Sequence, residues 1–411
     1  MTLDVVEICA GAGGQALGLE EAGFEHALAV ELDDHACNTL RENRPSWKVA
    51  RGDVAHSDVW KPADYHGVAL LAGGVPCPPF TIAGKQLGAT DERDLFAWAV
   101  ELAEVVKPRA LLLENVRGLS MPRFAGYRQH VLDRLAGLGY VPHWHLLQAS
   151  DFSVPQLRPR FVLVALQAED AAYFRWPDAE GEPPTVGETL GDAMAAEGWE
   201  GAADWALKAN RIAPTIVGGS KKHGGADLGP TRAKRAWAEL GVDALGIADS
   251  PPHPGDQFKV GPKLTVEMVS QLQGWQPGSW TFTGRKTARY RQVGNAFPPP
   301  VAAAVGGSIR RALEHRGQAA EPVPSEHDPI YRALRTSGSY LSQPQIQRAL
   351  GIPLDTSEFE RRISLLSRDF DVHVREDRGT TLYRLGEFKA FTGQDWHERH
   401  ELFLKNRAKI S

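Results

Sequence analysis

Short apolar segments alternate with helical patterns over the first 167 residues, and this alternation constrains the fold more than any other feature. Strands are expected in LDVVEI, HALAVELDD, VARGDV, VALLAGGVPC, PRALLLENV and RPRFVLVAL. Helices are expected in QALGLEEAG, HACNTLRENR, DLFAWAVELAEVVK and YRQHVLDRLAGLGY. Such alternation predicts an α/β protein with a doubly wound, mostly parallel, Rossmann-like sheet and right-handed crossovers. Since ligands of these sheets bind beyond the carboxyl ends of the strands, residues at those ends are candidate site residues.

The alternation of strands and helices stops after residue 167, which indicates further domains. Residues 168–284 are rich in Gly, Pro, Trp and Asp and read as an irregular inserted domain. Residues 285–318 read as a loop and a helix that return to the sheet, so the α/β domain is expected over 1–167 and 285–318. Residues 319–328 have the composition of a linker. Residues 329–411 follow the order helix, turn, helix, helix, hairpin, which predicts a winged-helix-like C-terminal module.

The bulk composition favours a globular protein of the cytoplasm. The N-terminus lacks a basic stretch followed by an apolar one, and no apolar run approaches the ~18 residues of a membrane span. The three cysteines, Cys9, Cys37 and Cys77, are an odd number without the spacing of a zinc site, so reduced thiols and no metal are expected. Because the net charge is -5, any polyanion would have to be held by local basic clusters.

A glycine turn and two acids suggest a nucleoside site. EICAGAGG lacks the Lys and Ser/Thr of a phosphate-binding loop, which argues against a nucleoside triphosphate. Its glycines would let a ligand approach the backbone at a helix N-terminus. Glu31 could accept two ribose hydroxyls, and Asp53 could accept an exocyclic amine. The alternative is a tight turn with acids that cap helices, and the residues alone leave both open.

GGVPCPPFTIAGKQ, residues 73–86, presents a cysteine between prolines. The prolines keep Cys77 out of a helix and favour a displayed side chain. A thiolate is a strong nucleophile, and Glu114 at a neighbouring strand end could hydrogen-bond or protonate a heterocycle nitrogen. Arg158 and Arg160 alternate along one strand, share a face, and could hold an oxygen or keep Glu114 in place. The alternative for Cys77 is a small buried hydrophobic residue.

In this order the motifs resemble those of the DNA cytosine-5 methyltransferases. The resemblance covers EICAGAGG, VELDD, RGDV, GGVPCPPFTIAGKQLG, LLLENVRGL, QLRPRF, LTVEMVSQLQGW and RYRQVGNAFPPPVA, about residues 4 to 312. The insert stands where the family has its target-recognition domain. The resemblance implies methyl transfer from S-adenosyl-L-methionine to carbon 5 of a flipped-out cytosine in double-stranded DNA. It also implies a bacterial restriction-modification enzyme near the nucleoid, with a cognate restriction endonuclease as a candidate partner.

The resemblance also assigns roles to residues. Cys77 would add to cytosine carbon 6, Glu114 would assist at ring nitrogen 3, and Arg158 and Arg160 would contact the base and support Glu114. The implied cofactor site consists of Cys9, Ala10, Gly11, Ala12, Gly13, Gly14, Glu31, Leu32, Asp53, Val54, Pro76, Leu95 and Asn295. The loop after Cys77, to about Asp94, would close over the substrate. The expected DNA contacts are Thr81, Lys85, Gln86, Lys221, Lys222, Arg232, Arg285, Lys286, Arg289 and Arg291. Cys9 departs from the family, because many members carry an aromatic residue there.

Two other functions fit parts of the sequence. An RNA cytosine-5 methyltransferase would share the fold, although such enzymes typically lack a long insert. A non-catalytic DNA-binding regulator would act through the C-terminal module, with SEFERRISLLSRDF as recognition helix and the following hairpin as wing. For that module, a protein-interaction or dimerisation role is equally compatible with the sequence.

Overall fold

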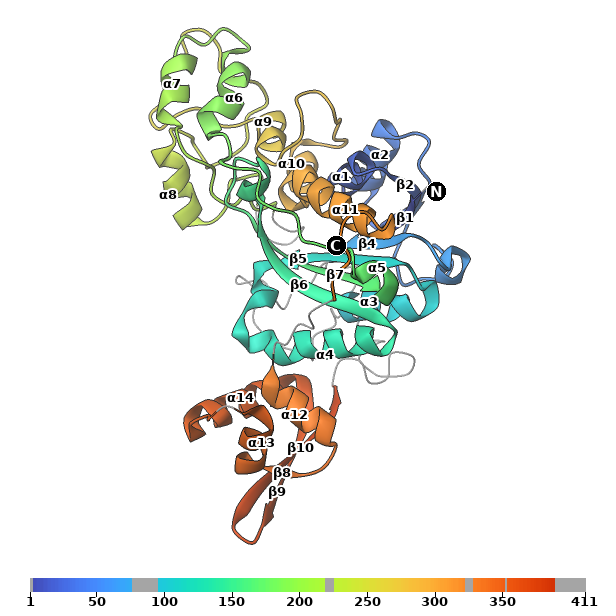
Figure 1. The fold of residues 1–411 in the computed structure, drawn as a ribbon. Helices are drawn as coiled ribbons and strands as arrows, with labels where there is room; N and C mark the ends of the chain where they lie inside the picture. Colours follow the sequence, from blue (N-terminus) through green and yellow to red (C-terminus); the bar gives the residue numbers. More distant parts are fainter. Residues whose placement is uncertain (1–2, 76–94, 219–224, 322–327, 352, 389–411) are drawn as a thin grey trace.

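The computed structural model describes residues 3–75, 95–218, 225–321, 328–351 and 353–388 (Figure 1). Its centre is a seven-stranded sheet in the order β3-β2-β1-β4-β5-β7-β6. The strands are β1 (Leu3–Ile8), β2 (Phe24–Glu31), β3 (Val49–Arg51), β4 (Leu70–Gly74), β5 (Ala110–Val116), β6 (Tyr140–Gln148) and β7 (Pro159–Gln167). The first five are parallel, and β7 runs antiparallel to both β5 and β6. The predicted mostly parallel α/β sheet is confirmed.

Strand β6 was missing from the sequence prediction, which continued a helix to Tyr140. That helix, α4, spans Ala125–Gly137, and Gly139 at φ 90° then turns the chain into β6. β6 is an edge strand, so one side of its backbone needs no ladder partner and Pro142 is tolerated. Polar side chains such as His143 and His145 hid its apolar alternation.

Helices cover both faces of the sheet, as a doubly wound fold requires. Leu111 and Leu113 of β5 pack in the layer beneath α3 (Leu95–Val106) and α4. Leu112 points to the opposite layer, which contains α1 (Gly14–Glu21) and α11 (Pro299–Leu313). The remaining elements of this domain are α2 (Asp34–Asn43), α5 (Ala168–Ala171) and the 3-10 helices η1 (Pro62–Tyr65), η4 (Arg117–Ser120), η5 (Pro122–Phe124) and η6 (Ala149–Phe152).

Two glycines let α11 lie directly on α1, although about 280 residues separate them. A Cβ on Gly18 would lie 2.3 Å from the Pro299 carbonyl oxygen, and a Cβ on Gly14 would lie 2.4 Å from that of Phe297. The clashing atoms are backbone, so they could not move aside cheaply. This contact brings the segment after α10 against the glycine turn.

Short helices joined by long stretches without helix or strand make up the described part of the insert. Its elements are α6 (Val186–Ala195), α7 (Ala202–Lys208), α8 (Thr231–Glu239) and α9 (Val266–Leu272), followed by α10 (Lys286–Asn295). Trp205 and Trp237 are buried in its core, and Trp275 and Trp280 continue that core to Leu40 of the α/β domain. Helices α6 to α8 and the C-terminal module lie at opposite ends of the molecule in Figure 1.

Residues 328–388 fold in the predicted order, with one additional short strand. The elements are α12 (Pro329–Ser337), β8 (Leu341–Ser342), α13 (Gln343–Leu350), α14 (Thr356–Asp369), β9 (Phe370–Asp377) and β10 (Thr380–Phe388). The strands form an antiparallel sheet in the order β8-β10-β9. In the described part of the chain, no helix is long and apolar enough to cross a membrane.

The α1–α11 contact generates a stability prediction. Gly18→Ala should lower the free energy of unfolding by about 1–3 kcal/mol, because the added methyl overpacks against backbone. Urea denaturation measures this value. Gly137→Ala is the matched control, since the space around Gly137 at the end of α4 is open. It should be neutral or stabilising by up to about 1 kcal/mol. Equal stability of the two variants would contradict the packing described.

Candidate active site

Residues predicted for the site gather at the carboxyl ends of four neighbouring strands. Gly11 follows β1, Glu31 ends β2, Gly74 ends β4 and Glu114 lies near the end of β5. β4 and β5 are parallel, and Gly74 stands opposite Glu114 in the register. The sheet therefore places the glycine turn, Glu31 and Glu114 at the same end of the sheet. We call this end, formed by the carboxyl ends of the strands, the strand-end edge.

The three glycines of the turn have different surroundings. Gly11 has φ +56° and open space where a Cβ would stand. A Cβ on Gly13, at φ +91°, would lie 2.6 Å from the Trp280 ring and 2.8 Å from Leu40. The Trp280 indole also donates to the Ala12 carbonyl oxygen at 2.9 Å. Gly11 is thus the glycine open to a ligand, whereas Gly13 and Gly14 also serve packing. Trp280 was not predicted as a site residue, because it lies in the insert outside any recognised motif.

The Glu31 carboxylate accepts hydrogen bonds both from the glycine turn and from the residues that follow β2. One carboxylate oxygen accepts the Gly11 amide at 2.7 Å, and the other accepts the amides of Leu32 at 2.9 Å and Asp33 at 2.8 Å. Burial raises the pKa of Glu31, and these amide donors act against that rise. The Cys37 thiol donates to the Glu31 carbonyl oxygen at 3.4 Å.

The surroundings of Glu31 fit a nucleoside. Leu32 is 40% exposed although it is apolar, and it stands directly after the carboxylate. Asp53 lies after β3 and accepts the Ala55 amide at 3.1 Å, while Val54 is buried. Cys9 is half-buried with φ 52° and packs against the core. Open backbone at Gly11, a carboxylate and an exposed apolar side chain are the groups that a ribose and a heterocycle require.

Glu114 forms a buried ion pair with Arg160. The Arg160 Nε lies 2.6 Å from the Glu114 Oε1, and the two side chains are 10% and 12% exposed. Burial raises the pKa of Glu114, while the cations Arg160 and Arg158 act against that rise. A Cβ on Gly74 would be 3.6 Å from the Glu114 Oε2, so the carboxylate faces the end of β4. Asn115 donates to the Val75 carbonyl oxygen at 3.2 Å and holds the chain just before Pro76.

Arg158 has a different setting from Arg160. It is 1% exposed, and its guanidinium donates to the carbonyl oxygens of Ile216 at 2.7 Å, Gly294 at 2.8 Å and Ala296 at 2.9 Å. It therefore ties the start of β7 to the insert and to the segment after α10. The sequence did not indicate this role, because the three acceptors are backbone atoms far away in the chain.

Several predicted site residues lie outside the described residues. These are Pro76, Cys77, Thr81, Lys85, Gln86, Lys221 and Lys222. Leu95 is buried as the first residue of α3. Asn295 ends α10 and is exposed, and a Cβ on Gly218 of the insert would lie 2.5 Å from its side-chain oxygen. Asn295 thus stands between the insert and the segment that packs on the glycine turn.

The remaining basic residues fall into two groups. Arg232 on α8 and Arg285 before α10 are exposed. Lys286 pairs with Asp249 at 3.0 Å and Arg289 with Glu267 at 3.0 Å, which offsets their charge, and Arg291 is half-buried. In the described ranges no cluster of three or more His, Cys, Asp or Glu side chains is arranged to hold a metal.

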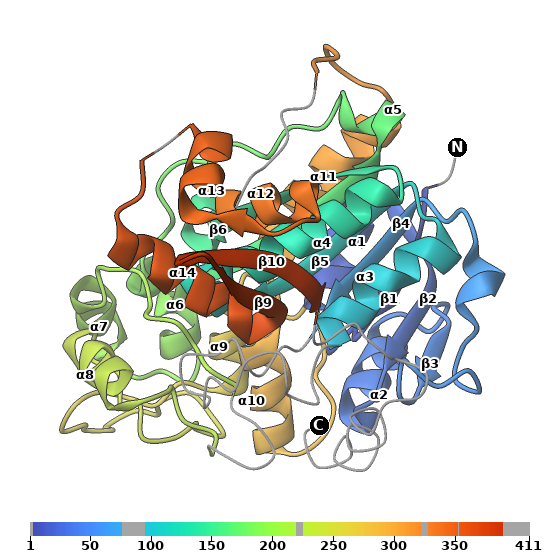
Figure 2. The same cartoon turned by 90° about the horizontal axis from the view of Figure 1, so that it is seen from below.

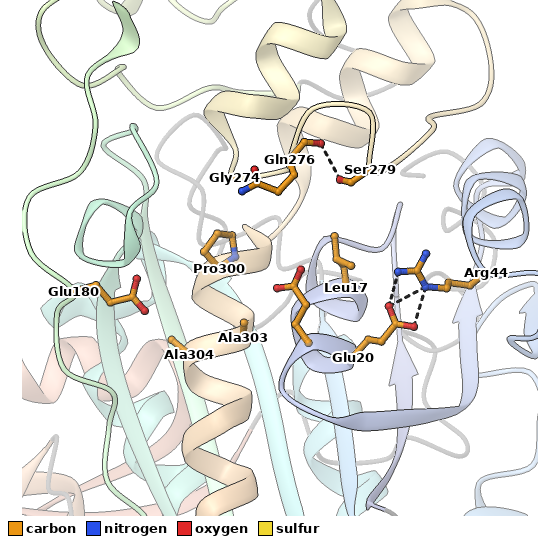
Figure 3. A pocket seen from close by; sticks show the side chains of 11 residues that line it. Leu17, Glu20, Arg44, Glu180, Gly274, Gln276, Ser279, Pro300, Ala303 and Ala304 are labelled. Carbon is orange, nitrogen blue, oxygen red and sulfur yellow. Dashed lines mark hydrogen bonds and ion pairs between the residues drawn. The ribbon is translucent and has the colours of Figure 1, made fainter. Parts of the chain in front are cut away.

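A separate cavity of about 630 Å³ lies between α1, α11 and residues 274–279 (Figure 3). Glu20 and Arg44 point toward one another there and form an ion pair at 2.5 Å. None of the residues predicted for the site lines this cavity. The candidate site is therefore the strand-end edge and not this cavity.

Comparison with known proteins identifies the family. A model of the C-5 cytosine-specific DNA methylase family matches residues 3–311. The chain is 67% identical over 411 residues to the Type II methyltransferase M.NaeI of Lentzea aerocolonigenes, with 100% of both chains covered. It is 50% identical over 318 residues to M.NgoMIV of Neisseria gonorrhoeae, which covers 76% of this chain and 99% of that one.

A solved structure supports the fold. A triple mutant of Spodoptera frugiperda DNMT2 superposes with a TM-score of 0.53 at 17% identity, covering 75% of this chain and 100% of that one. The family match and the identity to two type II methyltransferases agree with the motifs and with the strand-end site. The chain therefore belongs to the C-5 cytosine-specific DNA methylase family, and it is a DNA methyltransferase of the type II restriction-modification kind.

Proposed function

We propose that the chain methylates carbon 5 of a cytosine flipped out of a specific duplex sequence, through a covalent bond to Cys77. The observation that carries this proposal is the buried Glu114–Arg160 pair, whose carboxylate faces the end of β4. Cys77 follows Gly74 by three residues, a stretch of chain that spans at most about 11 Å. Chain connectivity therefore allows the nucleophile and the acid to share one site.

The glycine turn and Glu31 would hold S-adenosyl-L-methionine. Each Glu31 oxygen already accepts amide hydrogens but keeps acceptor capacity for ribose hydroxyls. Gly11 would admit the ligand to the backbone, and Leu32 and Asp53 would contact its heterocycle. S-adenosyl-L-methionine supplies a methyl group on a positively charged sulfur, which makes that methyl electrophilic. Roles for Cys9, Ala10, Ala12, Gly13, Gly14, Val54, Pro76, Leu95 and Asn295 in this site stay proposals.

Cys77 and Glu114 would act on different atoms of the cytosine ring. The Cys77 thiolate bonds to carbon 6 of the flipped cytosine, and the electrons of the 5,6 double bond move toward carbon 5 and the ring. Glu114, as the protonated acid, donates at ring nitrogen 3 and stabilises the charge that develops. Carbon 5 thereby becomes nucleophilic enough to accept the methyl group. Water takes the carbon 5 proton, the carbon–sulfur bond breaks, and the nitrogen 3 proton returns to Glu114, which restores the ring, the acid and the thiolate.

The two arginines have separate tasks in this mechanism. Arg160 pairs with the Glu114 carboxyl group, and we propose that it holds this group in place and contacts the base. Arg158 is taken up by three backbone carbonyls, so we revise its expected role from a base contact to a positioning residue. It fixes the insert against the catalytic domain at Ile216, directly before the segment with Lys221 and Lys222.

DNA would lie between the insert and the strand-end edge. Exposed Arg232 and Arg285 are the candidates for phosphate contacts, and Lys286 and Arg289 would first have to leave their acidic partners. The residues that would read bases, the closing loop with Thr81, Lys85 and Gln86, and a restriction endonuclease partner stay proposals. Duplex DNA is preferred over RNA as substrate because the family model that matches residues 3–311 is that of the C-5 cytosine-specific DNA methylases.

The C-terminal module has the element order of a winged helix. Its helix α14 is nevertheless poorly suited to contact DNA bases. Arg361 and Arg362 both pair with Glu358, at 2.6 and 2.7 Å, which neutralises part of the basic face. Leu366, toward the other end of α14, packs against Gly126 of α4. We therefore do not assign DNA reading to α14.

Cys77→Ser should abolish methyl transfer to duplex DNA, since the hydroxyl is a far weaker nucleophile than a thiolate. The measurement is transfer of labelled methyl to duplex DNA and to transfer RNA in parallel, with cofactor binding by calorimetry as the control for folding. The variant should still bind the cofactor. Methyl transfer to RNA alone, or full activity of the serine variant, would overturn the proposal.

The role proposed for Glu114 predicts how the turnover number depends on pH. Burial raises its pKa, and the acid must be protonated to donate, so turnover should fall as the pH rises through that pKa. Arg160→Met removes a cation that lowers this pKa, so the alkaline limb should move to higher pH. Glu114→Gln should lower the turnover number by about 100-fold or more and abolish that limb. Exposed Glu25, changed to Gln, is the control. An unchanged profile in Glu114→Gln would contradict the assignment.

Glu31→Gln should weaken cofactor binding about 10- to 100-fold, because hydrogen bonds to a charged acceptor contribute about 1.5–3 kcal/mol each. Isothermal titration with S-adenosyl-L-methionine measures the change, with Glu25→Gln at the other end of β2 as matched control. Equal affinities in the two variants would show that the cofactor binds elsewhere.

A further inference from the structure

The C-terminal module docks on helix α4 of the catalytic domain. Both views place α12 beside α4 (Figures 1 and 2), and α14 contacts the same helix. Gly126 of α4 faces Leu366, and a Cβ there would lie only 2.5 Å from that side chain. One turn later, the His130 Nδ1 lies 3.1 Å from the Tyr331 hydroxyl. Apolar side chains of α12 and α14 share one buried cluster with those of α4.

Helix α4 is also tied to the segment that follows Glu114. The chain passes from Glu114 and Asn115 through η4 and η5 into α4. Arg128 of α4 is 6% exposed, and its Nη1 donates back to the carbonyl oxygens of Leu119 at 2.8 Å and Met121 at 2.9 Å. These bonds fix the turn between the catalytic strand and the helix.

Arg128 also lies close to the residue that follows Arg160, the ion-pair partner of Glu114. Its guanidinium carbon lies 5.7 Å from the ring centroid of Phe161, which directly follows Arg160 in β7. The Phe161 ring also stacks on Trp144, with 4.8 Å between the ring centroids. One buried cation therefore contacts both the segment after Glu114 and the residue after Arg160.

An acidic residue of the module lies beside this part of α4. Asp328, the cap of α12, is buried, and its backbone amide donates to Gln129 beside Arg128 at 3.5 Å. Burial lowers the pKa of Arg128 to about 10, and the charge of Asp328 acts against that fall.

We propose that docking of residues 328–388 on α4 positions Glu114 for catalysis, with Arg128 as the positioning residue that connects the two. The inference goes beyond the proposed function and rests on it only in taking Glu114 as catalytic. M.NgoMIV is matched over 99% of its length by 76% of this chain, so that relative has no counterpart for roughly a quarter of this chain.

The docking contact is tested in the full chain by Gly126→Glu, with Gly137→Glu on the same helix as matched control. A carboxylate placed against Leu366 should release the module, whereas Gly137 faces open space. Gly126→Glu should lower the turnover number at least tenfold, raise hydrogen exchange in α12 and α14, and leave the cofactor Kd within twofold. Gly137→Glu should match the wild type in all three.

The connecting residue is tested by Arg128→Met, which keeps the apolar stem but loses both carbonyl bonds, and by Arg128→Lys, which keeps the charge. Arg128→Met should lower the turnover number and move the alkaline limb of the pH profile, and Arg128→Lys should partly restore both. Loss of cofactor binding in parallel would show general unfolding and overturn the specific role.

Normal turnover and an unchanged pH profile in Gly126→Glu, with the module released by hydrogen exchange, would overturn the inference. If Glu114→Gln is inactive in that same series, the proposed function survives and only the coupling to the module fails. If Glu114→Gln is fully active, the proposed function itself fails.

Discussion

The buried ion pair between Glu114 and Arg160 is the interaction on which the active site depends. It exists because β7 runs antiparallel to β5, which places Arg160 opposite Val116, two residues beyond Glu114. Charges taken out of water cost several kcal/mol each unless they meet a partner, so neither side chain has a favourable alternative position. The pair therefore holds a carboxyl group at the edge where the chain leaves β4 for Cys77.

The rest of the site is assembled from segments far apart in the sequence. Trp280 from the insert hydrogen-bonds to Ala12 in the glycine turn, and Arg158 joins the start of β7 to Ile216 and Gly294. Gly14 and Gly18 let α11 close against α1 from behind. Trp280 and Arg158 thus anchor the insert and the segment around α10 to the catalytic domain.

The sequence predicted the parts of this structure that depend on local pattern. The alternation of strands and helices predicted the sheet. The acids at the ends of apolar strands indicated Glu31 and Glu114 as candidate site residues. The edge strand β6 was missed because His143, His145 and Pro142 interrupt its alternation. The settings of Trp280 and Arg158 could not be foreseen, since their acceptors are backbone carbonyls distant in the chain. The docking of α14 on Gly126 could not be predicted either. A glycine within a helical pattern looks the same in the sequence whether solvent or a leucine side chain lies against it.

The most direct measurement is covalent trapping on a duplex that carries 5-fluorocytosine at the target, because fluorine blocks the final elimination. Wild type and Arg160→Met are incubated with cofactor and this duplex, and the DNA-bound peptide is mapped by mass spectrometry. We expect a methylated adduct on Cys77 that forms at least tenfold more slowly in the variant. An adduct on Cys9 or Cys37, or equal rates in both proteins, would contradict it.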